Sequence, residues 1–128
     1  MYRFFSVVLL TAGLLGAVAA GPALATTKTT HHVTCGAPSL SKAAAPAIGA
    51  SATYPAGSAG SVVVKRADAA NLQVAKATTN SGWTDQVLAG GPHAKVRFTN
   101  AGNHSIVRFQ ATLSRNGSQI HVRVTTCQ

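Results

Sequence analysis

Short runs of β-branched and other apolar residues, alternating with polar ones, fill the second half of the chain. From Ser61 to the last residue, Gln128, they predict six strands: SVVVKR, NLQVAKATT, WTDQVLA, AKVRFTN, SIVRFQATLS and QIHVRVTTC. Turn-forming residues separate the runs. The segment that comes closest to a helical pattern, ADAANLQVAKA, is equally consistent with a turn followed by a strand. We therefore expect an all-β domain over residues 61–128, a single small antiparallel β-sandwich or barrel of about six strands.

The last two predicted strands form a hairpin whose register follows from its turn. Asn116 and Gly117 are the preferred pair for a two-residue type I′ turn, which pairs Arg115 with Ser118. One face then carries the apolar pairs Leu113–Ile120, Ala111–Val122 and Phe109–Val124, and we take it as the core face. The other face carries Thr112–His121, Gln110–Arg123 and Arg108–Thr125. In AKVRFTN the same alternation points Val96 and Phe98 inward and Lys95, Arg97 and Thr99 outward.

Residues 1–25 have the pattern of a cleaved signal peptide. Arg3 precedes the apolar run FFSVVLLTAGLLGAVAA, and ALA at positions 23–25 supplies the small residues of a cleavage site. The run is shorter than the ~20 apolar residues that a membrane helix needs, so an uncleaved anchor is the less favoured alternative. We expect a secreted, extracellular protein with no integral membrane anchor after cleavage.

Residues 26–60 differ in amino-acid composition from the rest of the chain, because they are rich in Thr, Ala, Ser, Pro and Gly. Pro38, Pro46 and Pro55 oppose long regular elements. We expect an irregular, low-complexity N-terminal arm that is pinned at Cys35. In an exported chain with two cysteines, Cys35 and Cys127 most simply form one disulfide, with two unpaired thiols as the alternative. Closing so long a loop stabilises a domain by about 4 to 5 kcal/mol on the chain-entropy model.

The succession TYPAGSAGSVVVKR, LQVAKATTNSGWTDQV, KVRFTN, VRFQATL and IHVRV resembles small exported β-rich proteins of high-GC Gram-positive bacteria. The resemblance covers Tyr54 to Val124 and rests on the spacing of the runs and on the Gly82–Trp83 pair. It implies a bacterial extracellular setting. These proteins have no assigned activity, so the resemblance carries over no functional residues.

Acidic residues are scarce: eleven Lys and Arg stand against Asp68 and Asp85 alone. Asp85 lies two residues from Trp83, the single tryptophan. A catalytic carboxylate needs a partner carboxylate or histidine, and Asp68 lies in a polar turn of a chain without glutamate. We therefore interpret Trp83 as a core residue that anchors the fold. Asp85 is then a residue at the sheet edge that accepts hydrogen bonds from Arg66 or Arg115.

No other pattern indicates catalysis. The histidines (His31, His32, His93, His104, His121) lack the spacing of a zinc site, and we expect solvated side chains. No serine stands in a nucleophile-elbow pattern, and the glycines of AGSAG lack the context of a phosphate loop. We predict a protein that is not an enzyme, with no metal and no cofactor. The alternatives are a secreted hydrolase with an unrecognised site, or a protease inhibitor that uses the loop LAGGPHAK.

The remaining candidate is a basic sheet face, for which we predict the binding residues Lys95, Arg97, Arg108, His121 and Arg123. Like charges placed close together on a sheet are destabilising, which favours an anionic polymer or an acidic protein as the partner. A solvated face that keeps the protein soluble is the competing interpretation. The face lacks the interleaved aromatic residues of a nucleic-acid platform. Lys28 and Lys42, on the arm, are expected to lie apart from it, and nothing in the pattern indicates an oligomeric state.

Overall fold

The computed structural model describes residues 32–128, and this segment forms one compact unit. The predicted signal peptide, the start of the arm, Lys28 and His31 lie outside the described residues. The strands are β1 (Ser39–Ala44), β2 (Ser51–Pro55), β3 (Gly60–Arg66), β4 (Leu72–Thr79), β5 (Trp83–Ala89), β6 (His93–Asn100), β7 (Ile106–Leu113) and β8 (Gln119–Cys127), with one 3-10 turn, η2 (Gly57–Ala59). The fold is all-β, as expected.

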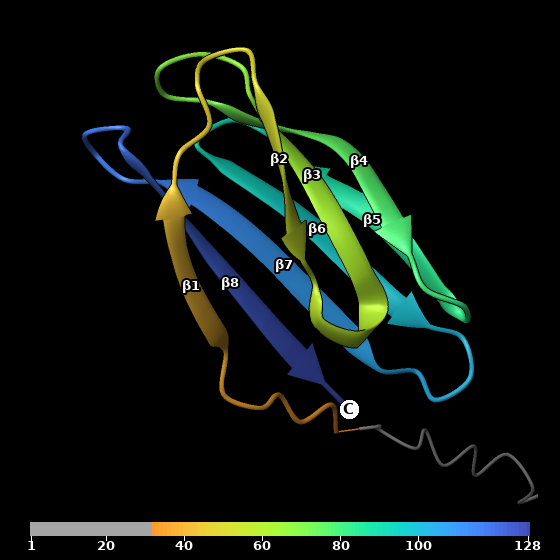
Figure 1. The fold of residues 1–128 in the computed structure, drawn as a ribbon. Helices are drawn as coiled ribbons and strands as arrows, with labels where there is room; N and C mark the ends of the chain where they lie inside the picture. The colour runs from red at the N-terminus through yellow and green to blue at the C-terminus, as the bar shows by residue number, and fades with distance from the viewer. Residues whose placement is uncertain (1–31) are drawn as a thin grey trace, which may run out of the picture. The chain divides into compact units, whose positions relative to one another are not determined.

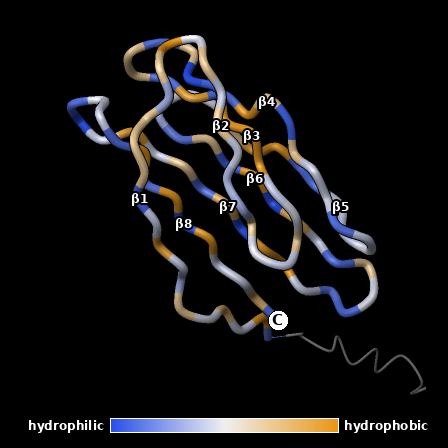
Figure 2. The backbone as a smooth tube through the Cα atoms, in the orientation of Figure 1, coloured by the Kyte–Doolittle hydropathy of each residue, from blue (hydrophilic) through white to orange (hydrophobic). Residues whose placement is uncertain are grey.

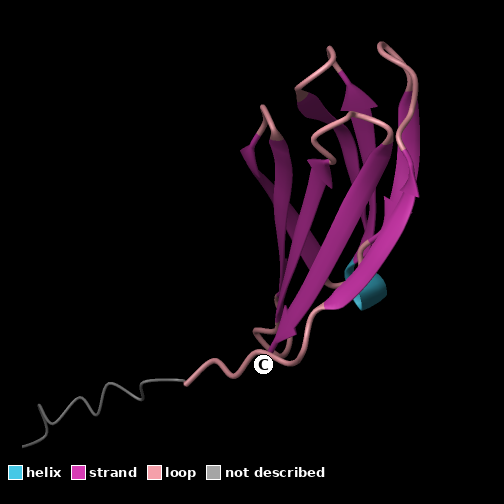
Figure 3. Ribbon diagram, turned by 90° about the vertical axis from the view of Figure 1, so that its left-hand side faces the viewer, coloured by secondary structure: helices cyan, strands magenta, loops and turns pink. Residues whose placement is uncertain are grey.

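Two antiparallel sheets make up the fold (Figure 1). The larger sheet has the strand order β1-β8-β7-β6-β5 and the smaller one the order β2-β3-β4. The sheets form two layers when the molecule is viewed from the side (Figure 3). Phe98 on β6 and Phe109 on β7 are the largest fully buried side chains between them. The domain is therefore a small β-sandwich whose core the alternating residues of both sheets fill.

The β7–β8 hairpin has the predicted register. Its inward pairs are Leu113–Ile120, Ala111–Val122 and Phe109–Val124. Val96 and Phe98 point into the core from β6, also as predicted. Hydrophobic and hydrophilic positions consequently alternate along these strands (Figure 2). The predicted register of the last hairpin and the inward side of its neighbour are both confirmed.

The turn of this hairpin is different from the predicted two-residue type. Gly117 has a φ of 67°, but Asn116 is not among the residues with positive φ, which a type I′ turn requires at both central positions. Instead the amide of Gly117 donates to the carbonyl of Ser114 at 2.9 Å, so the turn is built on Arg115 and Asn116 within a four-residue loop. The predicted two-residue loop and the observed four-residue loop are both centred on the peptide bond between Asn116 and Gly117. The pairing of the strands is therefore the same for either loop.

The prediction of an irregular arm is wrong for residues 39–55, which supply β1 and β2. β1 pairs with β8 from Ser39–Val124 to Ala44–Gln119, and β2 pairs with β3. Every residue of β1 is exposed, including the side chains on the inner side of its sheet. An edge strand that is covered on neither side needs no hydrophobic alternation, and SLSKAA has none. Pro55 ends β2, an edge strand in which its missing N–H group is tolerated.

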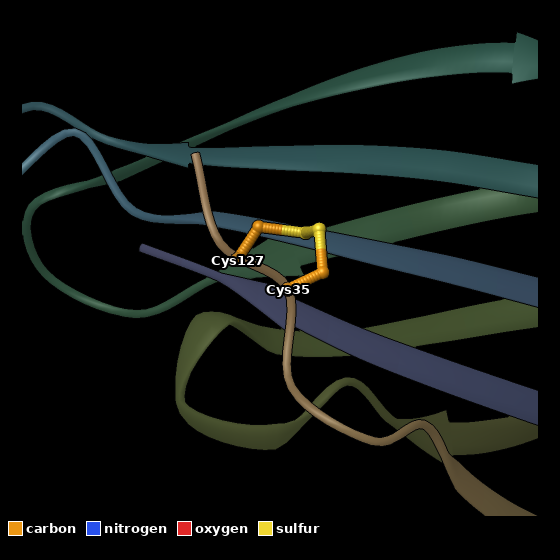
Figure 4. Close-up of a disulfide and its surroundings, with 2 residues drawn as sticks. All are labelled: Cys35 and Cys127. Carbon is orange, nitrogen blue, oxygen red and sulfur yellow. A yellow bond between two sulfur atoms is a disulfide. The ribbon is translucent and has the colours of Figure 1, made fainter. Parts of the chain in front are cut away.

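The disulfide between Cys35 and Cys127 is confirmed (Figure 4). The two cysteines lie opposite each other as an antiparallel bridge, with their Cα atoms 3.9 Å apart. Beside them, Thr34 and Gln128 exchange two backbone hydrogen bonds of 2.8 and 2.9 Å. The bond therefore closes a segment that continues the β1–β8 pairing, and it links positions 92 residues apart in the sequence.

Arg66, at the end of β3, fastens three loops of the sandwich. Its half-buried guanidinium donates to the carbonyl oxygens of Pro46, Asp68, Ala69 and Gly117, at 3.0 to 3.3 Å. These carbonyls belong to the β1–β2 loop, the β3–β4 turn and the β7–β8 turn. Charged donors to several backbone acceptors make strong hydrogen bonds, so this arginine has a structural role.

Candidate functional site

Trp83 and Asp85 lie on β5, the edge strand of the larger sheet. Trp83 is half-buried and packs against the margin of the core, whereas Phe98 and Phe109 occupy its centre. Asp85 is exposed, and the expected hydrogen bond from Arg66 is not formed because that guanidinium is occupied by carbonyl oxygens. Arg115 lies in the β7–β8 turn and also donates no hydrogen bond to Asp85 within residues 32–128. Trp83 therefore supports the fold from its edge and does not form its centre.

The five predicted binding residues lie together on the outer side of the larger sheet. Residues opposite each other on neighbouring antiparallel strands point to the same side. Arg97 on β6 lies opposite Arg108 on β7. Gln110 on β7 lies between two more cations, because Lys95 is opposite it on β6 and Arg123 is opposite it on β8. His121 lies opposite Thr112 on the same side.

Lys42 belongs to this group, contrary to the expectation that it lies apart on the arm. It is exposed on β1 directly opposite His121. The strand that carries it escaped prediction because none of its side chains is buried. We call the six residues Lys42, Lys95, Arg97, Arg108, His121 and Arg123 the cationic face. It extends over four neighbouring strands, from β6 to β1.

Neither carboxylate side chain of the described residues lies on the cationic face. Asp85 lies opposite the core residue Phe98 and therefore points to the inner side of the sheet. Asp68 lies in the β3–β4 turn, where it accepts hydrogen bonds from the Asn71 side chain and from the backbone amides of Ala70 and Asn71. The bond from the Asn71 side chain is the largest cause that lowers the pKa of Asp68, and the Ala70 amide adds to it. The positive charges of the face therefore have no internal counter-charge beside them.

Two adjoining hollows mark the part of the cationic face over β7, β8 and β1. The first, which we call the arginine hollow, has a volume of about 290 Å³ and is lined by Cys35, Arg108, Gln110, Arg123 and Thr125. The second, the leucine hollow, has a volume of about 230 Å³, and its lining includes Leu40, Lys42, Gln110, Thr112, His121 and Arg123. Gln110 and Arg123 line both hollows, which therefore adjoin each other. Arg97 and Lys95 lie on the same face but line neither hollow.

The histidines do not form a metal centre within residues 32–128, where no group of three or more His, Cys, Asp or Glu side chains comes together. His93 instead hydrogen-bonds through its Nδ1 to the Thr112 hydroxyl at 2.9 Å. His93 and His121 flank Thr112 on the two neighbouring strands. Of the two, only His121 lines the leucine hollow, and together they do not form a set of metal ligands within residues 32–128.

The loop LAGGPHAK, considered above for an inhibitor, is tied to the neighbouring sheet. Gly91 and Leu72 exchange backbone hydrogen bonds of 2.7 and 3.1 Å. The loop is thus a short connection between β5 and β6 that β4 holds in place.

Among the described residues, no helix is long and apolar enough to cross a membrane.

The chain matches no protein-family model, no curated protein and no solved structure. The chemistry of the site follows from its own residues. Guanidinium, ammonium, amide and hydroxyl groups are donors of hydrogen bonds, and the first two carry positive charge. Gathered without carboxylates on one outer sheet face, they suit the binding of anions.

Proposed function

We propose that the protein is a secreted, non-enzymatic protein that binds an anionic polymer through the cationic face. The observation that carries the proposal is the placement of Arg97 directly opposite Arg108 with no carboxylate on that side of the sheet. Like charges directly opposite each other destabilise a sheet, and a face that served only solubility would gain from their separation. A polyanion supplies the missing counter-charge and converts this repulsion into binding energy.

The extent of the face favours a polymer over a small anion. Its cations lie on four adjacent strands, which span about 15 Å at the usual spacing between strands. A chain with repeated negative groups can contact several of them at once. The outward positions that lie between these cations carry Gln, Thr and Leu side chains and no aromatic ring, which disfavours a nucleic-acid platform. The proposal that the protein is secreted rests on the leader pattern and on the disulfide, a bond that is typical of extracellular proteins.

The alternatives have less support. An inhibitor loop needs an exposed segment that can enter an active site, whereas Gly91 is hydrogen-bonded to β4. A hydrolase needs paired catalytic groups, and Asp68 and Asp85 lie on a turn and on an edge strand with no shared site. Binding through the cationic face uses residues that the fold brings together.

Charge reversal with a matched control tests the proposal. The triple variant Arg97→Glu, Arg108→Glu, Arg123→Glu should lower the affinity for heparin at least about 100-fold, because binding by counterion release depends on contacting cations. The control Lys65→Glu, Lys76→Glu, Arg115→Glu makes the same change in net charge away from the cationic face, and it should lower the affinity less than about 5-fold. Kd is measured by calorimetry at two salt concentrations, with thermal unfolding as the check on folding.

Two results would count against the proposal. If both triple variants lose affinity equally, binding follows net charge and the cationic face is not a site. If the wild-type protein binds neither heparin, nor polyuronate, nor another polyanion at low salt, the face is a solvated surface only.

A further inference from the structure

Four polar side chains surround the arginine hollow. Arg108 on β7 lies opposite Thr125 on β8. In the next outward row Gln110 lies opposite Arg123, so the four residues form the corners of one rectangle, with the arginines on a diagonal. At the usual strand spacing and rise, each corner lies about 4 Å from the centre of the rectangle in the plane of the sheet. Their donor groups therefore approach one common centre from four sides.

The donors of this rectangle are free, in contrast to those of Arg66. The guanidinium of Arg66 donates to four carbonyl oxygens of the protein. Within residues 32–128, no side-chain hydrogen bond is made by the four residues of the rectangle, which are Arg108, Gln110, Arg123 and Thr125. Guanidinium groups form strong charge-assisted hydrogen bonds with oxygen anions. Two unused guanidinium groups that line one hollow therefore favour an external anion at this place.

The neighbouring cations differ from these two in kind. Lys42 extends the positive charge along the leucine hollow, which Arg123 also lines. An ammonium group is a point charge that attracts any anion, whereas a guanidinium group has a planar fork of N–H donors that matches a pair of oxygen atoms. The positive charge is therefore continuous over the cationic face, and the arginine hollow is distinguished by the geometry of its donors.

The anionic groups of polymers differ in the number of oxygen atoms that they present. A carboxylate presents two oxygens in one plane, and a backbone phosphodiester presents two non-bridging oxygens. A pendant sulfate or phosphate monoester presents three oxygens, which diverge around the bond to its carrier. Donors on four sides of one centre are used more fully by three diverging oxygens than by two. The arrangement of the hollow thus favours the monoester groups.

We infer that the arginine hollow is a receptor for a pendant sulfate or phosphate monoester, so that the polymer is a sulfated or phosphorylated chain and not a polycarboxylate. This inference rests on the proposed function and specifies the charged group of its ligand. The amide of Gln110 and the hydroxyl of Thr125 complete the set of donors without adding charge. The other cations of the face attract the rest of the polymer and place no requirement on its oxygen geometry.

Derivatives of one dextran isolate the effect of the anionic group. Dextran sulfate and carboxymethyl dextran, prepared with the same chain length and the same number of charged groups per sugar, have equal charge near neutral pH. At ~0.15 M salt, we expect dextran sulfate to bind about 10-fold more tightly. Dextran phosphate, compared with dextran sulfate near pH 5, where its monoester carries about one charge, distinguishes the two sources. Tighter binding of dextran phosphate assigns a phosphate monoester, and weaker binding assigns a sulfate.

Charge-preserving variants test whether the arginine hollow seats the group. Arg108→Lys and Arg97→Lys both retain the net charge, but Arg108 lines the hollow and the directly opposite Arg97 does not. We expect Arg108→Lys to lower the affinity for dextran sulfate about 10-fold and to reduce its preference over carboxymethyl dextran to within about 2-fold. Arg97→Lys should change the affinity and the preference less than about 2-fold. Calorimetry gives each Kd, and thermal unfolding checks the fold of each variant.

The neutral donors provide a second matched pair. Thr125→Val removes a hydroxyl donor of the hollow without changing charge or size, and it should lower the affinity for dextran sulfate about 3-fold. Thr99→Val makes the same change on the outer side of β6, where the residue lines neither the arginine hollow nor the leucine hollow, and it should leave the affinity unchanged.

The outcomes separate the inference from the proposed function. If dextran sulfate and carboxymethyl dextran bind equally tightly, the hollow does not recognise oxygen geometry, so the inference is wrong and the anionic-polymer function stands. If Arg97→Lys and Arg108→Lys have equal effects on the preference, the sulfate is not seated in the arginine hollow and the inference is also wrong. If the wild-type protein binds none of the dextrans and no heparin at low salt, both the inference and the proposed function fail.

Discussion

The outer faces of the two sheets carry basic residues in different arrangements. On the smaller sheet, Lys65 lies opposite Gln73 and Lys76 lies opposite Val63, so each ammonium group has a neutral neighbour. On the larger sheet, Arg97 lies opposite Arg108, and more cations follow on β8 and β1. Both faces are exposed to solvent and both are free of carboxylates. The difference therefore lies in the placement of the charges and not in their presence.

This contrast separates a solvated surface from a candidate site. Dispersed lysines keep a sheet soluble at little cost, as on the smaller sheet. Arginines placed opposite each other are unfavourable for the folded protein alone, and their planar groups are suited to oxygen anions. Of the opposed pair, Arg108 lines the arginine hollow together with Arg123, and Arg97 lies outside it on the same face. Clustered cations and a hollow thus occur together on the larger sheet and not among the dispersed lysines of the smaller one.

Removal of the disulfide should have the largest effect and should act first on the larger sheet. The double variant Cys35→Ser, Cys127→Ser should lose about 4 kcal/mol of unfolding free energy, because the loop between these residues is no longer closed in the unfolded chain. Since β1 is fully exposed, its amides should exchange with solvent much faster in the variant, and those of β3 less so. Urea unfolding and hydrogen exchange measure both. Equal acceleration of amide exchange in β1 and β3 would contradict the expectation that the disulfide stabilises mainly the larger sheet.

The next effect concerns Arg66, an arginine of the smaller sheet that serves the fold. Arg66→Met should lower the free energy of unfolding by about 2 to 3 kcal/mol, because four carbonyl oxygens lose a charged donor. Lys65→Met, at the exposed neighbouring position, should change it by less than about 0.5 kcal/mol. Neither variant should change polyanion affinity by more than a few-fold. Chemical denaturation gives the free energies of unfolding of both variants. A similar loss in the two would contradict the structural role of Arg66.

A smaller effect of opposite sign is expected at Arg97. Arg97→Gln should raise the free energy of unfolding at low salt by about 0.3 kcal/mol, because it relieves the repulsion from Arg108. Lys65→Gln should show no such gain, since Gln73 is its opposite neighbour. The gain at position 97 should vanish near 1 M salt, where the screening length is about 3 Å. A stability curve that does not depend on salt would mean that the two guanidinium groups do not repel each other.

The smallest effect is the contribution of Asp68 to stability at acid pH. Its pKa is lowered in the folded protein, first by the hydrogen bond from the Asn71 side chain. A carboxyl whose folded pKa is depressed contributes stability above its unfolded pKa and loses it as the pH falls through the folded pKa. NMR titration should therefore find Asp68 with a midpoint below the value for an isolated aspartate, and Asn71→Ala should raise it. An unchanged midpoint in that variant would contradict the assigned cause.

The sequence predicted the centre of the fold well because burial leaves a pattern. The apolar residues of β6, β7 and β8 alternate because one side of their sheet faces the core, and this alternation also fixed the outward side with Arg97, Arg108 and Arg123. The turn after β7 was predicted with the wrong type, but its midpoint was right and the register followed. Cys35 and Cys127 form the disulfide that was expected for two cysteines in an exported chain.

What the sequence concealed were the elements that bury little. β1 is held by backbone hydrogen bonds to β8 and exposes all of its side chains, so SLSKAA resembles a loop in composition. Lys42 and Leu40 were therefore missed as parts of the candidate site. Trp83 was expected to be a core residue that anchors the fold, yet it lies on the edge strand β5 and is only partly buried against the core. Neither position follows from local pattern, because each depends on where a strand stands in its sheet.

The Cys35–Cys127 bond also determines how the domain would respond to mechanical tension. Force applied through Thr34 and Gln128 passes from one strand end to the other across a covalent bond and not through the hydrogen bonds of the sheets. The 91 residues between the two cysteines, which contain all eight strands except the final residue of β8, would then carry almost none of the load. The oxidised domain would act as an inextensible link in a stretched chain, and its reduced form would unravel under the same pull.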